Sequence, residues 1–89
     1  MKPTRNSTQF KRDFKKLQKA GKDMTKLIDV MKLICEEKPL PDMYQDHPLQ
    51  GEWHGFRDCH IEPDWVLIYC IYPDRIRFER TGSHSELFG

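Results

Sequence analysis

The sequence of 89 residues lacks the features that mark membrane, secreted and zinc-binding proteins. It has no apolar run near the roughly 20 residues that span a bilayer, and its first ten residues are polar, unlike a signal peptide. Its three cysteines are odd in number and include no CxxC pair, so they predict neither a disulfide framework nor a zinc finger. We therefore expect a cytoplasmic protein with reduced cysteines and no membrane contact.

The length of the chain is that of one domain, and no repeat or low-complexity tract divides it. A domain of this size buries only about 60–65% of the surface that its unfolded chain exposes, so its core will be thin. We expect a single domain over residues 1–89.

The net charge of +1 hides an uneven distribution. Residues 1–22 hold eight basic residues against the single acid Asp13, a balance of +7, which leaves −6 for the other residues. Such a basic segment is typical of a protein that meets a polyanion or an acidic partner on one side. A solvated, lysine-rich helix face would give the same pattern, so charge alone does not decide between these interpretations.

Apolar residues at helical spacing predict a first, basic helix after residue 7. Phe10, Phe14 and Leu17 repeat at i, i+4 and i+7. A hydroxyl at residues 7–8 can cap the start of this helix, and Gly21 can end it.

A second helix is predicted from Asp23, which can cap it, to Pro39, which ends it. Its apolar stripe is expected to consist of Leu27, Met31 and Ile34.

Three strands are expected after the helices, over residues 53–61, 66–72 and 76–81, and an edge strand over residues 2–7. The second of them is nearly continuous apolar sequence, typical of a strand buried on both faces. This order predicts an α+β fold in which N-terminal helices pack on one face of a mostly antiparallel, twisted sheet.

Alternation along the first long strand places Asp58 and His60 on one face, with His54 and Phe56, and Trp53 on the other. A carboxylate two residues from an imidazole can orient it and raise its pKa. An acid–base pair is therefore predicted on one face of the sheet.

Further candidates lie outside that strand. His47 occupies the polar, proline-rich connection of residues 39–51, which is long enough to suggest a working loop. Alternation puts Arg80 on the face of Ile76, and His84 has the same parity near the C-terminus.

Histidines, aspartates and an arginine around one sheet suit metal-free cleavage of RNA. That reaction needs a base for the 2′-hydroxyl, an acid for the leaving 5′-oxygen and a cation for the charge on phosphorus. Histidine and aspartate could instead bind a metal, although no HExxH spacing occurs. Trp65 and Phe88 could stack on bases, although a tryptophan that begins a core strand more often packs inside.

Two stretches resemble the YafQ branch of the RelE/ParE toxin superfamily. Residues 46–69 contain DHPLQG and WHGFRDCHIEPDW, and residues 78–89 contain RTGSH and a terminal LF pair. The N-terminal helices match by pattern only. The resemblance implies a small RelE-like toxin of a type II toxin–antitoxin system that cleaves messenger RNA, usually on the ribosome, without a metal or other cofactor.

The resemblance also implies a role for each motif residue. His84 would be the main acid–base catalyst, and the other histidines would assist proton transfer or hold the phosphate, their division between base and acid staying open. The aspartates would orient the histidines, the aromatic residues would shape the nucleotide pocket, and Arg80 would lie near the scissile phosphate. The implied motif positions are His47, Asp58, His60, Asp64, Trp65, His84 and Phe88.

The same resemblance predicts the partners. They are a cognate antitoxin, expected to be a DinJ-like ribbon-helix-helix protein in a heterotetramer, and messenger RNA with the ribosome. The basic helix would contact RNA backbone, or the acidic C-terminal segment of the antitoxin, through Lys11, Lys15, Lys16 and Lys19.

Two other functions fit parts of the pattern. A non-enzymatic ParE-like toxin would use this fold to bind a protein such as DNA gyrase, but it would have no reason to keep the histidine and aspartate set. A metal-dependent hydrolase would hold its ion through His47, His60, His84 and the aspartates. A purely structural module fits least well, because ionisable groups concentrated in this way are typical of functional sites.

Overall fold

One mixed sheet organises the fold in the computed structural model, which describes residues 2–89. Its strands are β1 (Thr4–Asn6), β2 (His47–Pro48), β3 (Arg57–Glu62), β4 (Trp65–Ile71) and β5 (Ile76–Gly82). The helices are α1 (Thr8–Lys19), α2 (Met24–Cys35) and α3 (His84–Phe88), with short 3-10 turns η1 (Asp42–Tyr44) and η2 (Gly51–Trp53). The strand order is β1-β5-β4-β3-β2; β1 runs parallel to β5, and the other neighbours are antiparallel.

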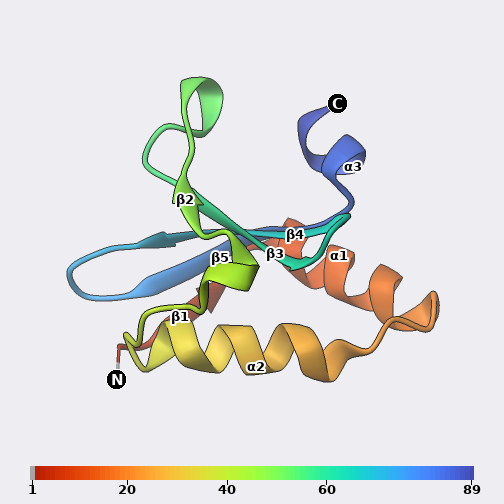
Figure 1. Cartoon of the computed structure of the whole chain (residues 1–89), viewed down its shortest axis with the longest axis horizontal. Coiled ribbons are helices and arrows are strands. Elements are labelled where there is room, and N and C mark those ends of the chain that lie inside the picture. The colour runs from red at the N-terminus through yellow and green to blue at the C-terminus, as the bar shows by residue number, and fades with distance from the viewer. Residues whose placement is uncertain (1) are drawn as a thin grey trace.

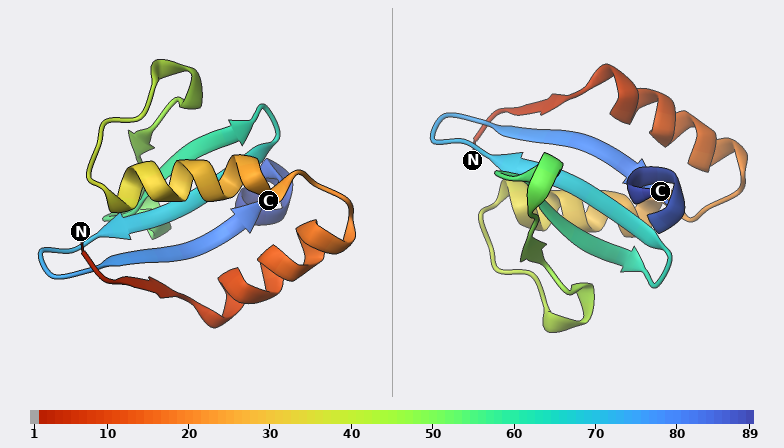
Figure 2. Two further views of the ribbon diagram at one scale, coloured as in Figure 1. Left: turned by 90° about the horizontal axis from the view of Figure 1, so that it is seen from below. Right: turned by 90° about the horizontal axis from the view of Figure 1, so that it is seen from above.

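The two faces of the sheet are covered differently. Figure 1 shows α2 on one side of the sheet, and the β2 segment and α3 on the opposite side, which we call the open face. Figure 2 shows α2 lying across the strands and α1 running beside the β1–β5 edge. The predicted α+β fold, with N-terminal helices against a mostly antiparallel sheet, is confirmed.

The predicted first helix forms with local signals at both ends. The Ser7 hydroxyl accepts a hydrogen bond from the Phe10 amide at 2.9 Å, so Ser7 is the cap. Gly21 follows the helix with a φ of +84°, where a glycine has no side chain to clash. The amide of Lys22 then donates to the carbonyl of Leu17, which closes the last turn.

The second helix begins at its predicted cap but ends earlier than expected. Asp23 accepts from the Thr25 amide, whereas α2 stops at Cys35 rather than at Pro39. Glu37 takes a left-handed φ of +58°, which turns the chain before the proline is reached. The side chains that α2 buries are Leu27, Val30 and Ile34, so Met31 lies beside the buried stripe rather than in it.

Strand β4 contributes to a core on each face of the sheet, which explains its continuous apolar sequence. Trp65, Leu67 and Tyr69 belong to the large core beneath α2. Val66 and Ile68 belong to a small cluster on the open face, packed against Leu87, Leu49, Trp53, Phe56 and Phe88.

The prediction of a strand over residues 53–61 is wrong for its first half. Trp53 ends η2, and the chain turns at Gly55, whose φ is +95°, before β3 begins at Arg57. Alternation therefore fails there, and the Trp53 ring packs edge-on against Phe56 at 5.6 Å, in the cluster on the open face.

A bulge in β5 overturns the predicted face of Arg80. Ile68 pairs with Arg80, but the next residue of β4, Tyr69, pairs with Phe78, so Glu79 is an extra residue in β5. One extra residue reverses the alternation. Arg80 therefore shares the open face with Ile68 instead of the α2 face with Phe78.

Candidate active site on the open face

The strand register aligns the polar candidates in one row across the sheet. His47 pairs with Asp58, Asp58 with Ile68, and Ile68 with Arg80. Residues directly opposite one another in a sheet lie on the same face. An imidazole, a carboxylate and a guanidinium from three different strands therefore share the open face.

Asp58 is the buried centre of this row. Its side chain is 4% exposed, and its Oδ1 lies 3.0 Å from His47 Nδ1 but accepts no well-aligned hydrogen bond within residues 2–89. Burial raises the pKa of the Asp58 carboxyl group, while the nearby His47, His60 and His84 lower it. All three predicted histidines thus act electrostatically on one carboxylate, and His60 is only one of them.

The backbone around His47 and His60 selects their tautomers. His47 Nδ1 lies 2.8 Å from the Gln45 carbonyl oxygen and 3.0 Å from Asp58 Oδ1. His60 Nδ1 lies 3.3 Å from the Pro63 carbonyl oxygen. Because a carbonyl can only accept, each Nδ1 carries the hydrogen and each Nε2 keeps a lone pair. In its neutral form, each ring can therefore take up a proton at Nε2.

His84 begins α3, a short helix that the sequence analysis did not predict. Ser83 and Glu86 form a capping box, and Asp64 Oδ1 accepts from the His84 amide at 3.1 Å. The His84 ring lies 4.8 Å from the ring of Phe88. The S-x-x-E spacing of the box is visible in the sequence and would have predicted this helix.

Arg80 is held by Asp13, a residue that our sequence analysis did not assign to the site. The guanidinium donates to both carboxylate oxygens, at 2.8 and 3.3 Å, and the Thr81 amide donates to Oδ2 at 3.2 Å. This bond raises the pKa of Arg80. Asp13 takes two of the five guanidinium N–H donors, so others stay available to an anion. The sequence did contain a signal for this role of Asp13, because it is the one acidic residue in the basic segment of residues 1–22.

Trp65 does not line the open face, contrary to the role implied for it. The residue is 1% exposed and packs in the core beneath α2, where its indole nitrogen donates to the Thr81 hydroxyl at 3.0 Å. A buried ring has no free surface on which a base could stack. Among the two aromatic candidates, Phe88 alone is accessible beside His84.

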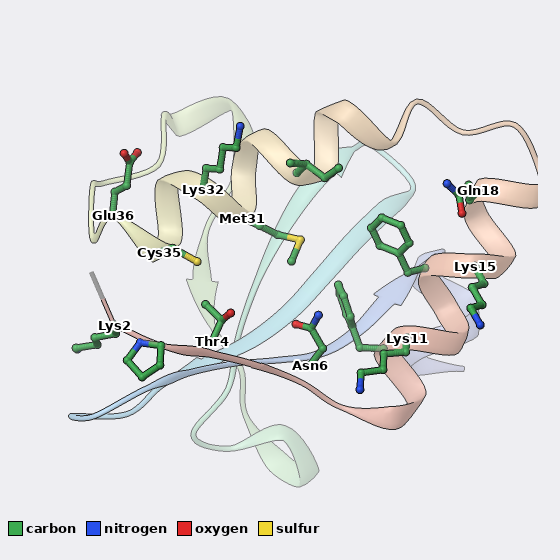
Figure 3. Close-up of a pocket in the computed structure, with 14 residues that line it drawn as sticks. Lys2, Thr4, Asn6, Lys11, Lys15, Gln18, Met31, Lys32, Cys35 and Glu36 are labelled. Atoms are coloured by element: carbon green, nitrogen blue, oxygen red, sulfur yellow. The ribbon is translucent and has the colours of Figure 1, made fainter.

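The four candidate lysines of α1 do not form one surface. Lys11 and Lys15 line a groove of about 1200 Å³ between β1, α1 and α2, which also has Lys2 and Lys32 at its sides (Figure 3). Lys16 instead binds Glu86 of α3. The apolar part of the groove is formed by Phe10, Phe14, Ile28 and Met31. Lys11 and Lys15 are therefore separated from the open face.

Neither a metal centre nor a membrane span was found in residues 2–89. No group of three or more His, Cys, Asp or Glu side chains in that range is arranged to hold a metal ion. No helix there is long and apolar enough to cross a bilayer.

Comparisons with known proteins agree on one family. Residues 2–89 match the model of "Bacterial toxin of type II toxin-antitoxin system, YafQ". The chain is 54% identical over 84 residues to the mRNA interferase toxin YafQ of Escherichia coli K12, covering 93% of this chain and 91% of that protein. The crystal structure of YafQ from E. coli BL21(DE3) superposes with a TM-score of 0.96 at 49% identity, covering all of both chains. The structure of the E. coli DinJ–YafQ complex gives 0.92 at 51% identity, again over both full chains.

Proposed function

The chain belongs to the YafQ family of bacterial type II toxins, and on that premise we propose that it cleaves messenger RNA by metal-independent histidine chemistry. Its relative from E. coli K12 carries the name mRNA interferase. The proposed site of action is the ribosome, in the cytoplasm. The observation that carries the proposal is that His47, His60 and His84 all act electrostatically on the buried carboxylate of Asp58, from which His47 Nδ1 lies 3.0 Å away.

The proposed reaction is an attack of the ribose 2′-oxygen on the neighbouring phosphorus. One histidine takes the 2′-hydroxyl proton as the O–P bond forms, and another gives a proton to the 5′-oxygen as the P–O5′ bond breaks. The products are a 2′,3′-cyclic phosphate and a free 5′-hydroxyl. His84 is proposed as the main acid–base group because of the family resemblance of its motif, and its side chain is exposed at the start of α3, where a substrate can reach it.

The other residues would prepare this transfer. Asp58 stabilises positive charge on the histidines as they gain protons, and Asp64 fixes the backbone of His84. Arg80 offers its remaining N–H donors to the charge that develops on phosphorus. Phe88 provides a ring surface beside His84 against which a base can stack.

The test is to map the 5′ ends of cellular messages after expression of the protein or of His84→Ala in a bacterial host. His54→Ala is the matched control, because His54 is exposed and is not among the groups that shift the pKa of Asp58. We expect new ends at recurring positions within codons, present with the control and absent with His84→Ala. Growth arrest by all three proteins with intact messages would instead indicate a toxin that binds a protein target.

The chemical part of the proposal has a test of its own. Purified protein, supplied with ribosomes and message, should cut at an unchanged rate in excess chelator and leave 2′,3′-cyclic phosphate ends. In this assay a polyamine replaces magnesium, because the chelator would otherwise dissociate the ribosomes. Loss of cleavage under these conditions would contradict the metal-independent mechanism. Cleavage of naked RNA at the same rate would contradict the use of the ribosome.

We also propose that the groove between β1, α1 and α2 receives an acidic, amphipathic segment of a DinJ-like antitoxin. The E. coli neighbour was solved in complex with DinJ. The groove pairs an apolar floor with a rim on which Lys11, Lys15 and Lys32 outnumber the one acid, Glu36. A helix or strand with one apolar and one acidic side would match both. The expected assembly is a heterotetramer built on a ribbon-helix-helix antitoxin dimer.

Charge reversal and apolar-to-charged replacement in the groove test this assignment. Lys15→Glu and Ile28→Asp should each weaken antitoxin binding by about tenfold or more, equivalent to about 1.4 kcal/mol. Met43→Asp is the control for the second variant, because Met43 is an exposed apolar residue outside the groove. Unchanged affinity of both groove variants in a calorimetric titration would show that the antitoxin binds elsewhere.

A further inference from the structure

His47 stands on a segment that has little backbone pairing to hold it. Strand β2 has two residues, and it pairs only His47 with Asp58 and Pro48 with Arg57. Proline has no amide hydrogen to donate to a strand ladder. Ordering a backbone residue costs about 1–2 kcal/mol in conformational entropy, so side chains must help to fix this loop.

Asp46 makes the contacts that anchor the loop. Its Oδ1 accepts from the Tyr69 hydroxyl at 2.5 Å and from Arg57 Nε at 3.3 Å, and its Oδ2 accepts from Arg57 Nη2 at 3.2 Å. Tyr69 is 2% exposed in the central strand β4, and burial raises its pKa, so it stays a donor. A two-pronged bond from a guanidinium fixes a carboxylate in orientation as well as distance.

This clamp lies on the opposite side of the sheet from His47. Arg57 and Tyr69 are cross-strand partners, and Tyr69 belongs to the core beneath α2. Successive residues of an extended chain point to opposite faces. With Asp46 held on the α2 side, the next residue is directed to the open face, where Asp58 lies.

The clamp also bears on the tautomer of His47. Gln45 precedes Asp46 with a left-handed φ of +50°, and its carbonyl accepts from His47 Nδ1. If Asp46 moves, this carbonyl moves with it. Asp58 Oδ1, 3.0 Å from the same Nδ1, favours the same tautomer. A fixed Asp46 therefore reinforces the hydrogen on Nδ1 and leaves Nε2 free to accept a proton.

Given the ribonuclease function proposed above, we propose that Asp46, clamped by Arg57 and Tyr69, is the positioning residue for His47 in proton transfer. Asp46 itself does not contact RNA in this mechanism; it acts through the place and the tautomer of the imidazole. Its loss should therefore lower kcat more than it raises KM.

The first test needs no RNA. It measures the ring-nitrogen chemical shifts of His47 by NMR in 15N-labelled wild type, Asp46→Ala and Tyr69→Phe. We expect the Nδ1–H form in the wild type, a mixture containing the Nε2–H form in Asp46→Ala, and a smaller change in the same direction in Tyr69→Phe. Asp74→Ala is the control, because Asp74 is a highly exposed aspartate whose partner is its neighbour Arg75. Unchanged His47 shifts in Asp46→Ala would overturn the proposal.

The second test is a double-mutant cycle on cleavage. Asp46→Ala should lower kcat toward the loss caused by His47→Ala, about 10²-fold or more for an acid–base group, and the double variant should be no slower than His47→Ala. Additive losses would overturn the positioning role. Asp46→Asn, which keeps an acceptor oxygen, should recover part of the rate, and it replaces Asp46→Ala if that variant does not fold. If the protein cleaves no RNA but shows the expected His47 chemical shifts, the proposed ribonuclease function is wrong, whereas the positioning of His47 by Asp46 is supported.

Discussion

Replacement of Asp58 by asparagine should stabilise the fold at neutral pH while it removes activity. The carboxylate is buried, and one of its oxygens accepts no well-aligned hydrogen bond within residues 2–89, although His47 Nδ1 lies 3.0 Å from it. A buried polar group without a partner costs about 1–3 kcal/mol, and more when it is charged. An amide of the same shape carries no charge, and it would recover about 1–2 kcal/mol of this cost. For a domain of this size, each kcal/mol corresponds to about 4–8 °C in Tm.

The dependence of this gain on pH follows from the raised pKa of Asp58. Because the folded state holds the Asp58 proton more tightly than the unfolded state, ionisation destabilises the fold as pH rises. The advantage of the Asp58→Asn variant should be absent below about pH 4, the ordinary range of an aspartate, and should grow toward pH 7. Calorimetric Tm values across this range, with Asp74→Asn as an exposed control, measure it. A variant less stable than wild type at pH 7, or a gain independent of pH, would refute the reasoning.

Three further substitutions test separate contacts. Asp13→Ala should lower the free energy of unfolding in urea by about 3 kcal/mol, because Arg80 loses a buried carboxylate partner; a change below 0.5 kcal/mol would contradict this. Trp65→Phe should cost about 1–3 kcal/mol in the same titration yet leave RNA affinity unchanged, since the ring lies in the core. Glu86, whose pKa Lys16 lowers to about 2, should stabilise the fold above pH 4.5 and lose this effect as the pH falls toward 2, so the Tm difference from Glu86→Gln should vanish there.

The parts of the fold that sequence predicted are those set by local signals. The caps Ser7 and Asp23, the stop at Gly21 and the continuous apolar run of β4 each act within a few residues, so the sequence shows them directly. The position of Arg80 depends instead on a bulge, and nothing in the order of residues says which strand holds the extra one.

The candidate site was predicted as a set of residues but not as an arrangement. The positions of His47, His60 and His84 made them candidates, and the resemblance gave them roles, but only the strand register placed His47 opposite Asp58. Alternation in the strand had favoured Asp58 as the partner of His60 alone, because a two-residue strand such as β2 leaves no periodic pattern. Burial, which excludes Trp65 from the open face, is likewise a property of packing between distant segments.

The parallel pairing of β1 with β5 has a consequence for synthesis of the chain. Thr4 meets Ile76 in that pair, and Asp13 meets Arg80 across 67 residues. Contacts of such high sequence separation form only after the intervening chain is available. A nascent chain that has not yet released β5 and α3 lacks both the anchor of its first helix and His84. Helix α1 therefore gains its anchor only after β5 has been synthesised, and the N-terminal segment cannot complete its packing without the strand that lies 67 residues further along the chain.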